Sequence, residues 1–419
     1  MSLGSCSPRS RILAWLTVLI VTGGLSFGCQ APALASAAKG SGPNLARASA
    51  YLVAPANLID GHYYESFPHA ADFGLTIDVA LALAATGQEN PALRKIVAFL
   101  AAGGKDASGK TINNWTGLGT ADASGGAIGK EALLAEVVGD NPRSFGGHNL
   151  IAGLDALVCV AGSAGSAGTS GSAGSAGADG RCPSVGSYAY ATSVFDQALG
   201  IMAQLRAGQR EKAAAPIAYL ESLQNADGSF ASLIPAGGGP DVDSTAMAVM
   251  ALALAPGPVA AAHVTSGVAW IARQQESGGG FPGAGGDSIN SAGLAIQALT
   301  LRAAQYQPRI SAAQVFLARQ QNSDGGFKAD AGGQEGSNLR ASAQAVGGAV
   351  GISFGILRRD LNGRSAGTGP GISIVVVALL AALALAVAAV LALLLLRRGR
   401  LNSRSASQES SRLAHRVSS

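Results

Sequence analysis

Histidine, cysteine and aromatic residues are scarce in this chain of 419 residues, which has five histidines, four cysteines and 5% aromatic residues. The spacing of His62, His69, His148 and His263 fits no zinc-binding motif, so we expect no metal site and no cofactor. Charged residues make up only 13%, and acidic residues slightly outnumber basic ones between residues 38 and 370. This stretch lacks the basic patch that nucleic-acid binding requires, and we expect no nucleic-acid partner.

Both ends of the chain carry a long apolar run next to arginines. At the N-terminus, Arg9 and Arg11 precede an apolar stretch over residues 12–21, and Ala-x-Ala sequences follow. This order is typical of a secretory signal peptide, which we place at residues 1–37. The segment that ends at Cys29 also resembles a lipoprotein signal, but its leucine lies one position too far from the cysteine.

The C-terminal run predicts a membrane anchor. Residues 372–396 are all uncharged and nearly all apolar. At about 1.5 Å per residue, a helix of this length exceeds the ~30 Å hydrocarbon core of a bilayer. The basic tail over residues 397–419 should stay in the cytoplasm by the positive-inside rule. We therefore predict a single-pass type I protein of the cell membrane, with an extracellular domain over residues 38–355 and a linker over residues 356–371.

Two cysteines are expected in the extracellular domain, Cys159 and Cys182. They flank a low-complexity loop of glycine, serine and alanine over residues 160–181. Because an extracellular compartment is oxidising, we predict a disulfide between them, with two free thiols as the alternative. Closing a loop of this length would contribute about 3 kcal/mol in the chain-entropy model.

A short motif of the form Q-x-x-x-G-x-F occurs three times in the C-terminal half of this domain. The copies start 51 and 46 residues apart, and a degenerate copy with Asn57, Gly61 and Tyr63 lies near the N-terminus. In each copy we expect the glycine to let the chain reverse, the glutamine amide to bond backbone groups of a neighbouring segment, and the aromatic ring to cover the turn. The three copies consist of Gln224, Gly228 and Phe230; Gln275, Gly279 and Phe281; and Gln321, Gly325 and Phe327.

Each copy lies between two apolar segments with helical periodicity. The segment before it has a polar stripe and should form an outer helix, whereas the segment after it is apolar nearly all round and should be buried. Following this alternation backwards gives six pairs, which predict an all-α protein with a closed α6/α6 toroid of six helical hairpins, because closure leaves no end helix unpaired. The expected pairs are 43–54 with 72–87, 91–101 with 126–138, 147–161 with 189–205, 211–224 with 241–255, 262–275 with 287–302, and 310–321 with 337–352.

The three copies resemble the QW repeats of terpene cyclases and of protein prenyltransferase β-subunits. The chain is similar to bacterial secreted or surface proteins with prenyltransferase/squalene oxidase repeats, over about residues 40–355. This resemblance implies an α/α toroid with a central funnel. It does not imply the chemistry, because unrelated functions share one fold. Cobalamin carriers of the intrinsic-factor type, for example, have the same toroid.

The stretch that begins at Asp241 resembles the DxDD segment of squalene–hopene cyclases, in which the middle carboxylic acid protonates an alkene. Asp241 and Asp243 take the first two acidic positions here, and Ser244 replaces the third. If the protein is a cyclase, the resemblance makes Asp243 the acid and Asp241 its neighbour. An aromatic content of 5% is low for an enzyme that must stabilise carbocations.

A simpler interpretation is that this stretch starts a helix. Asp243 aligns with Asn290 and Ser337 in the following repeats. Aspartate, asparagine and serine are the residues whose side chains most often cap a helix N-terminus. A cap recurs in every repeat, whereas a catalytic acid is needed once. We therefore predict that Asp243, or Ser244 beside it, is a helix cap, and that no residue is catalytic.

The sequence thus favours a binding protein over an enzyme. We predict a membrane-anchored extracellular toroid that binds a small ligand or a protein partner at the cell surface. Three alternatives stay open. They are a polysaccharide-active enzyme, which needs paired carboxylates in one cleft; a terpene-cyclase-like enzyme; and a module that captures a ligand of the cobalamin type.

Overall fold

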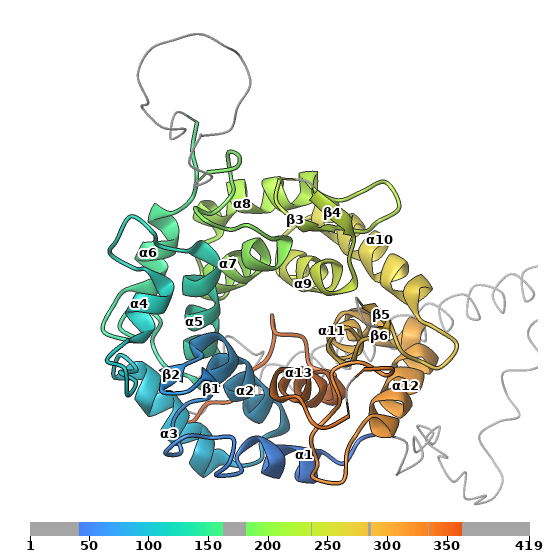
Figure 1. The fold of residues 1–419 in the computed structure, drawn as a ribbon. Coiled ribbons are helices and arrows are strands. Elements are labelled where there is room, and N and C mark those ends of the chain that lie inside the picture. The colour runs from blue at the N-terminus through green and yellow to red at the C-terminus, as the bar shows by residue number, and fades with distance from the viewer. Residues whose placement is uncertain (1–41, 162–181, 236, 284–285, 334, 363–419) are drawn as a thin grey trace, which may run out of the picture. The chain divides into compact units, whose positions relative to one another are not determined.

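The computed structural model describes residues 42–161, 182–235, 237–283, 286–333 and 335–362, and within them twelve helices form two concentric rings (Figure 1). Each inner helix packs against the inner helices on both sides, and the last packs against the first, so the ring is closed. The predicted α/α toroid is confirmed. The inner helices are α2 (Phe73–Thr86), α5 (Gly125–Val138), α7 (Val194–Arg206), α9 (Val242–Leu252), α11 (Ile289–Leu299) and α13 (Leu339–Val350). The outer helices are α1 (Leu45–Leu52), α3 (Asn90–Ala101), α6 (Leu150–Ala156), α8 (Arg210–Ser222), α10 (Pro258–Gln274) and α12 (Ala303–Arg319).

The all-α prediction missed several short elements. An extra helix, α4 (Ile112–Thr116), precedes α5, and the 3-10 helix η1 (Thr300–Arg302) follows α11. Strands of two to four residues are too short to show alternating hydrophobicity, which is why the sequence did not reveal them. Among the described residues they form three antiparallel hairpins: β1 (Glu65–Phe67) with β2 (Ala70–Ala71), β3 (Ala231–Leu233) with β4 (Gly237–Pro240), and β5 (Pro282–Gly283) with β6 (Gly286–Asp287).

The membrane predictions lie beyond the part of the chain that the structure describes. Residues 1–37, 372–396 and 397–419 are all outside it. No helix within the described ranges is long and apolar enough to cross a bilayer. The signal peptide and the C-terminal anchor therefore stay predictions.

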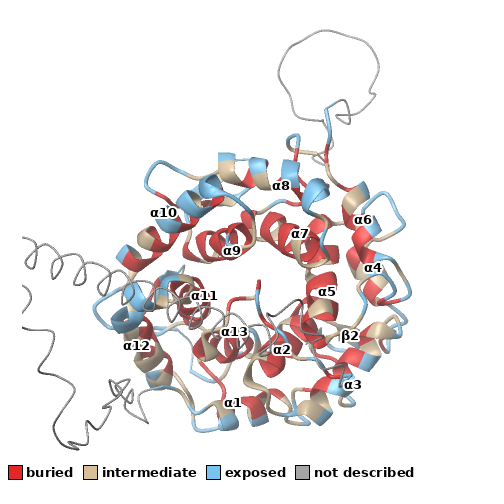
Figure 2. Ribbon diagram, turned by 180° about the vertical axis from the view of Figure 1, so that it is seen from behind, coloured by how far each residue is buried: buried red, intermediate tan, exposed pale blue. Residues whose placement is uncertain are grey.

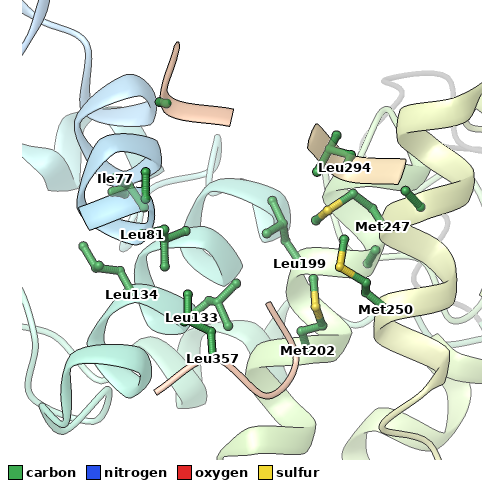
Figure 3. Packing of buried hydrophobic residues seen from close by; sticks show 14 of the residues in the cluster. Ile77, Leu81, Leu133, Leu134, Leu199, Met202, Met247, Met250, Leu294 and Leu357 are labelled. Atoms are coloured by element: carbon green, nitrogen blue, oxygen red, sulfur yellow. The ribbon is translucent and has the colours of Figure 1, made fainter. Parts of the chain in front are cut away.

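Burial follows the two-ring arrangement (Figure 2). The inner helices are buried nearly all round because they have outer helices on one side and the centre of the ring on the other. The centre is filled by leucine and methionine side chains from several inner helices, including Leu133, Leu199, Met202 and Met250 (Figure 3). Burying each such side chain contributes about 1.5–3 kcal/mol, so the centre of the ring stabilises the fold.

The repeat glutamines link each pair of helices to the next outer helix. Gln224 Nε2 donates to the carbonyl oxygen of His263 at 2.9 Å, and Gln275 Nε2 donates to that of Arg309 at 2.8 Å. Gln321 Nε2 donates at 2.9 Å to the carbonyl of Asn44, the residue that caps α1. The third glutamine thus joins the last repeat to the first and closes the ring.

The repeat glycine and aromatic residue are both required by geometry. Gly325 has a φ of +100°, and a Cβ there would lie 2.4 Å from the carbonyl oxygen of Arg47 on α1. Phe327 is fully buried, and its backbone N–H donates to Ser342 Oγ at 2.8 Å. This last bond recurs between Phe230 and Thr245 at 3.0 Å, so a hydroxyl in the first turn of the inner helix fixes the aromatic residue.

The same type of hydrogen bond, from the backbone N–H of the aromatic residue to a side chain of the inner helix, shows that the aromatic residue of the degenerate copy was predicted wrongly. Tyr64, not Tyr63, donates its backbone N–H to Thr76 Oγ1 at 3.1 Å and is fully buried. A further copy of the motif, which lacks the glutamine, was not recognised in the sequence. There Gly186 has a φ of +85°, and the N–H of the buried Tyr188 donates to Gln197 Oε1 at 3.0 Å.

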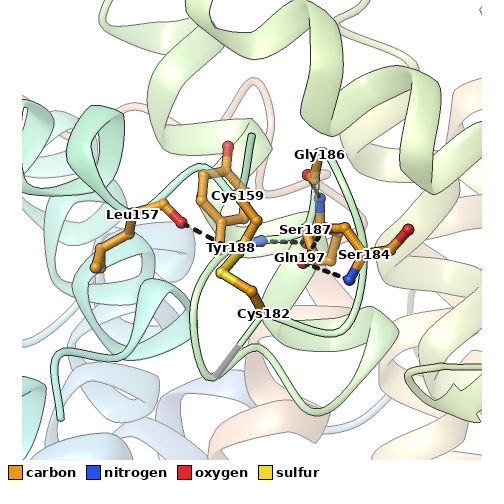
Figure 4. The surroundings of a disulfide bond; sticks show 8 residues. All are labelled: Leu157, Cys159, Cys182, Ser184, Gly186, Ser187, Tyr188 and Gln197. Atoms are coloured by element: carbon orange, nitrogen blue, oxygen red, sulfur yellow. Dashed lines mark hydrogen bonds between the residues drawn. A yellow bond between two sulfur atoms is a disulfide. The ribbon is translucent and has the colours of Figure 1, made fainter. Parts of the chain in front are cut away.

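Cys159 and Cys182 form a disulfide, with their Cα atoms 5.8 Å apart (Figure 4). The backbone beside it is paired as well, because the N–H of Cys159 donates to the carbonyl oxygen of Ser187 at 2.9 Å. The disulfide therefore joins the segment that follows α6 to the turn before α7. Residues 162–181, within the low-complexity loop, lie outside the described residues.

After α13 the chain turns into the centre of the ring and closes one end of it (Figure 1). Arg206 donates to the carbonyl oxygens of Phe354, Gly355 and Leu357 at 2.7–3.3 Å. Leu357 is buried among the central leucines, and the N–H of Leu361 donates to the carbonyl of Val138 at 2.9 Å. Residues 356–362, which we expected in the linker, are thus part of the packed domain.

Candidate functional site

The inner helices begin together at the end of the ring opposite to this C-terminal segment. We call this end the mouth. It is defined by the N-cap residues of the inner helices, each of which accepts a hydrogen bond from the backbone N–H three residues later. These residues are Asp72, Ser124, Ser193, Asp241, Ser288 and Asn338.

The prediction that Asp243 or Ser244 caps its helix is wrong. Asp241 is the cap, since its Oδ2 accepts from the N–H of Ser244 at 2.7 Å. The alignment was also three residues out in the last repeat, where the cap is Asn338 and Arg340 occupies the position of Asp243. The error arose because the loop before α13 carries several residues that can cap a helix, although it is as long as the loop before α9.

Asp243 lies in the first turn of α9 with its carboxyl group turned toward α11. Its Oδ2 accepts a hydrogen bond from Asn290 Nδ2. Its Oδ1 is buried without a partner among the described residues. Burial raises the pKa of Asp243 to about 6; the Ser291 side chain nearby opposes the rise, and the charge of Asp241 adds to it. A buried carboxyl with this pKa can hold or release a proton near neutral pH.

A cavity of about 440 Å³ opens at the mouth between α2, α4, α5, α7 and α13. Gly74 and Gly126 occupy the second position of α2 and α5, where a larger side chain would fill this space. Trp115 and Phe195, both half-buried, supply aromatic walls, and Leu199 is among the lining residues. Asp243 is not among the residues that line this cavity.

The polar side of the cavity is a network of charges from three inner helices. Lys130 Nζ lies 2.7 Å from Asp78 Oδ1, with both side chains mostly buried. Arg340 bridges Asp78 at 3.4 Å and Asp72 at 2.8 Å. Burial alone would raise the pKa of Asp72, but hydrogen bonds from Ser66 and the backbone, with the charge of Arg340, hold it below its ordinary value.

Asp196 completes the charged lining. Its carboxylate lies against Gly126, where a Cβ would come within 2.4 Å of Oδ1, and its Oδ2 accepts from Ser193 Oγ at 2.8 Å. Burial raises the pKa of Asp196, while Ser193 and Lys130 oppose the shift. The cavity thus combines two aromatic side chains with two carboxylates and two cations, and a third carboxylate, Asp78, is paired with Lys130 beside it.

Asp72 lies within a helix that the sequence predicted, but no sequence pattern pointed to Trp115, Lys130, Asp196 or Arg340 as site residues. These residues come from four elements spread over most of the domain. Only closure of the ring brings them together, so no spacing motif joins them. The one signal in the sequence was a charged residue within the first turns of otherwise apolar helices.

The fold defines the class of protein, a closed α/α toroid with a polar mouth. Comparison of the chain with known protein families agrees with this class. Residues 168–329 match the family model of the prenyltransferase alpha-alpha toroid domain. The match and the closed ring confirm the α/α-toroid fold that the repeats predicted.

Solved structures show the same fold. A variant of the type II terpene cyclase MstE from Scytonema, in complex with geranylgeranyl dihydroxybenzoate, has a TM-score of 0.51 at 17% identity over 74% of this chain and 97% of that one. A protein from Actinoplanes has a TM-score of 0.50 at 21% identity over 73% and 97%. No curated protein matches the chain. At these identities the likeness shows the fold alone.

Proposed function

We propose that this chain is a membrane-anchored extracellular toroid that binds a small polar ligand in the mouth cavity. The observation that carries the proposal is the cavity itself, in which Trp115 and Phe195 stand beside Lys130 and Asp196. Ligand sites are typically concave, largely apolar, and fitted with a few polar groups that orient the ligand. A volume of about 440 Å³ lies toward the lower end of the usual ~300–1,000 Å³, which favours a ligand smaller than cobalamin.

The exit of the chain supports this arrangement. Asn362, the last described residue, donates through Nδ2 to Asp140 Oδ1 at 2.7 Å, beside the C-terminal end of α5. It therefore lies at the end of the ring opposite to the mouth. An anchor over residues 372–396 would hold that end toward the membrane and leave the mouth open to the exterior. Protease added to intact cells should then remove the domain, and protection of the domain would refute the topology.

Intrinsic fluorescence tests whether the cavity binds ligands. Trp115 is half-buried in the cavity, whereas Trp270 is buried in α10. Titration with chemically diverse small molecules should give saturable changes in the emission of wild type that are absent from Trp115→Phe. Trp270→Phe is the matched control and should keep the response. A set of compounds that changes wild type and Trp115→Phe equally would contradict the proposal.

Proton transfer by Asp243 is the second candidate function. The observation in its favour is a buried carboxyl with a pKa of about 6 and one oxygen without a partner among its described neighbours. A cyclase acid needs such a proton at neutral pH. Incubation with a linear polyene such as geranylgeranyl dihydroxybenzoate tests the candidate. Cyclised product from wild type that disappears in Asp243→Asn would support it, and no product from wild type would exclude this substrate.

A further inference from the structure

The hydrogen-bonding groups in the mouth cavity are only partly used by the protein. Lys130 Nζ carries three N–H donors and, within the described ranges, forms an ion pair with Asp78 alone. The indole N–H of Trp115 has no hydrogen-bond partner among the described residues. The Asp196 carboxylate is held from one side by the turn before α7, and a carboxylate accepts about four hydrogen bonds in all. The cavity therefore offers donors and an acceptor at the same time.

Trp115 and Lys130 lie close together beside Gly74 in the lining of the cavity. Trp115 Cζ2 lies 3.6 Å from the position that a Cβ on Gly74 would occupy, and Lys130 Nζ lies 3.9 Å from the same point. Because residue 74 is glycine, no side chain from this position covers either group; the nearest atom to the same point is Asp72 Oδ1, at 3.4 Å. Asp196 stands over Gly126 on the adjacent helix, close enough to Lys130 for their charges to interact.

The charges restrict the class of ligand. The cavity and its network hold three carboxylates, Asp72, Asp78 and Asp196, against two cations, Lys130 and Arg340. An acidic ligand would add a further negative charge to this set. A purely apolar ligand would remove water from the charged groups without replacing its hydrogen bonds, which costs free energy. A neutral ligand rich in hydroxyl groups avoids both costs.

We propose that the mouth cavity binds a neutral sugar, with one sugar ring stacked on Trp115 and its adjacent hydroxyl groups bonded to Lys130 and Asp196. A hydroxyl group both donates and accepts, so neighbouring hydroxyls satisfy an ammonium and a carboxylate together. The apolar face of the sugar ring packs on the indole of Trp115. Tryptophan suits this contact because it combines a large apolar surface with one polar N–H group. This inference rests on the proposed function, since it names the ligand of the same cavity.

Isothermal titration of the full-length protein tests the inference, in a detergent that carries no sugar head group. The probes are glucose, galactose, mannose, N-acetylglucosamine, maltose and cellobiose, with glucuronate and galacturonate as acidic counterparts. At least one neutral sugar should bind saturably, and both uronates should bind at least about tenfold more weakly than that sugar. Failure of all six neutral sugars to bind at concentrations up to about 50 mM, well above the ~1 mM dissociation constant of a weak site, would overturn the inference.

Variants locate the binding. Trp115→Ala and Asp196→Asn should each weaken the sugar at least about tenfold, while Trp270→Phe, outside the cavity, should leave it within about twofold. Circular dichroism verifies the fold, and Trp115→Phe, which keeps an aromatic face, should retain part of the affinity. Unchanged affinity in Trp115→Ala and Asp196→Asn would also overturn the inference. If another class of compound alters Trp115 fluorescence while no neutral sugar binds, the proposed binding function stands and the sugar assignment fails.

Discussion

Replacing Glu131 by glutamine should change how the stability of the protein depends on pH. Glu131 lies on α5, is fully buried, and neither of its carboxyl oxygens has a partner among the described residues. Its Oε1 lies 2.5 Å from the point that a Cβ on Gly146 would occupy, so packed chain surrounds it. Burial raises the pKa of Glu131 from an ordinary 4.5 to about 8.

The sign and size of the effect follow from this shift. The folded protein keeps the proton on Glu131 up to about pH 8, whereas the unfolded chain releases it above about pH 4.5. The unfolded state therefore binds fewer protons between these values, and the free energy of unfolding falls as pH rises. One pKa unit corresponds to about 1.4 kcal/mol, so the full shift amounts to about 4–5 kcal/mol. Glutamine does not titrate, and Glu131→Gln should escape this loss.

Equilibrium urea unfolding at pH 5, 6, 7 and 8 measures the difference. Other titrating groups are common to both proteins and cancel, so the stability of Glu131→Gln relative to wild type should rise by about 1–1.4 kcal/mol per pH unit. Glu211→Gln, on the exposed surface of α8, is the control for loss of a carboxylate and should give a nearly flat difference. Parallel profiles for wild type and Glu131→Gln would show that Glu131 is ionised in the folded protein, and the reasoning would be refuted.

Four further predictions concern the α9 cap, the Asp243 carboxyl group, the ring closure and the disulfide. Asp241→Ala should lower the free energy of unfolding by about 0.5–2 kcal/mol through loss of the cap. Asp243→Asn should instead be more stable than wild type above pH 6, because burial raises the pKa of Asp243 to about 6 and asparagine stays neutral. A stability difference between the variant and wild type that is the same at pH 5 and pH 8 would contradict this. Gln321→Ala removes hydrogen bonds that join the first and last repeats at an exposed position and should cost about 0.5–1.5 kcal/mol by urea unfolding. A neutral result would show that the ring closes without these bonds. Thiol labelling without reductant should detect neither Cys159 nor Cys182, and two labelled thiols would contradict the bond.

The sequence by itself determined the architecture. Half-polar and fully apolar helical segments alternate along the chain. The fully apolar helices must be covered on both sides, and two concentric rings of helices achieve this. The three repeat copies marked the same point of each unit, and their glycine and glutamine have the roles that their chemistry suggested. These features are local, or depend on a neighbour at a fixed period, so a single sequence contains them.

The tertiary structure alone decided the site. Which of several adjacent polar residues caps an inner helix depends on where the helix begins, and this is why Asp241 rather than Asp243 is the cap. The path of residues 352–362 into the ring depends on Arg206 and on space between the inner helices. The mouth cavity joins Trp115, Lys130 and Arg340 from distant parts of the chain. Distances across a closed ring are set by packing and by the last contact between α13 and α2, and no sequence period encodes them.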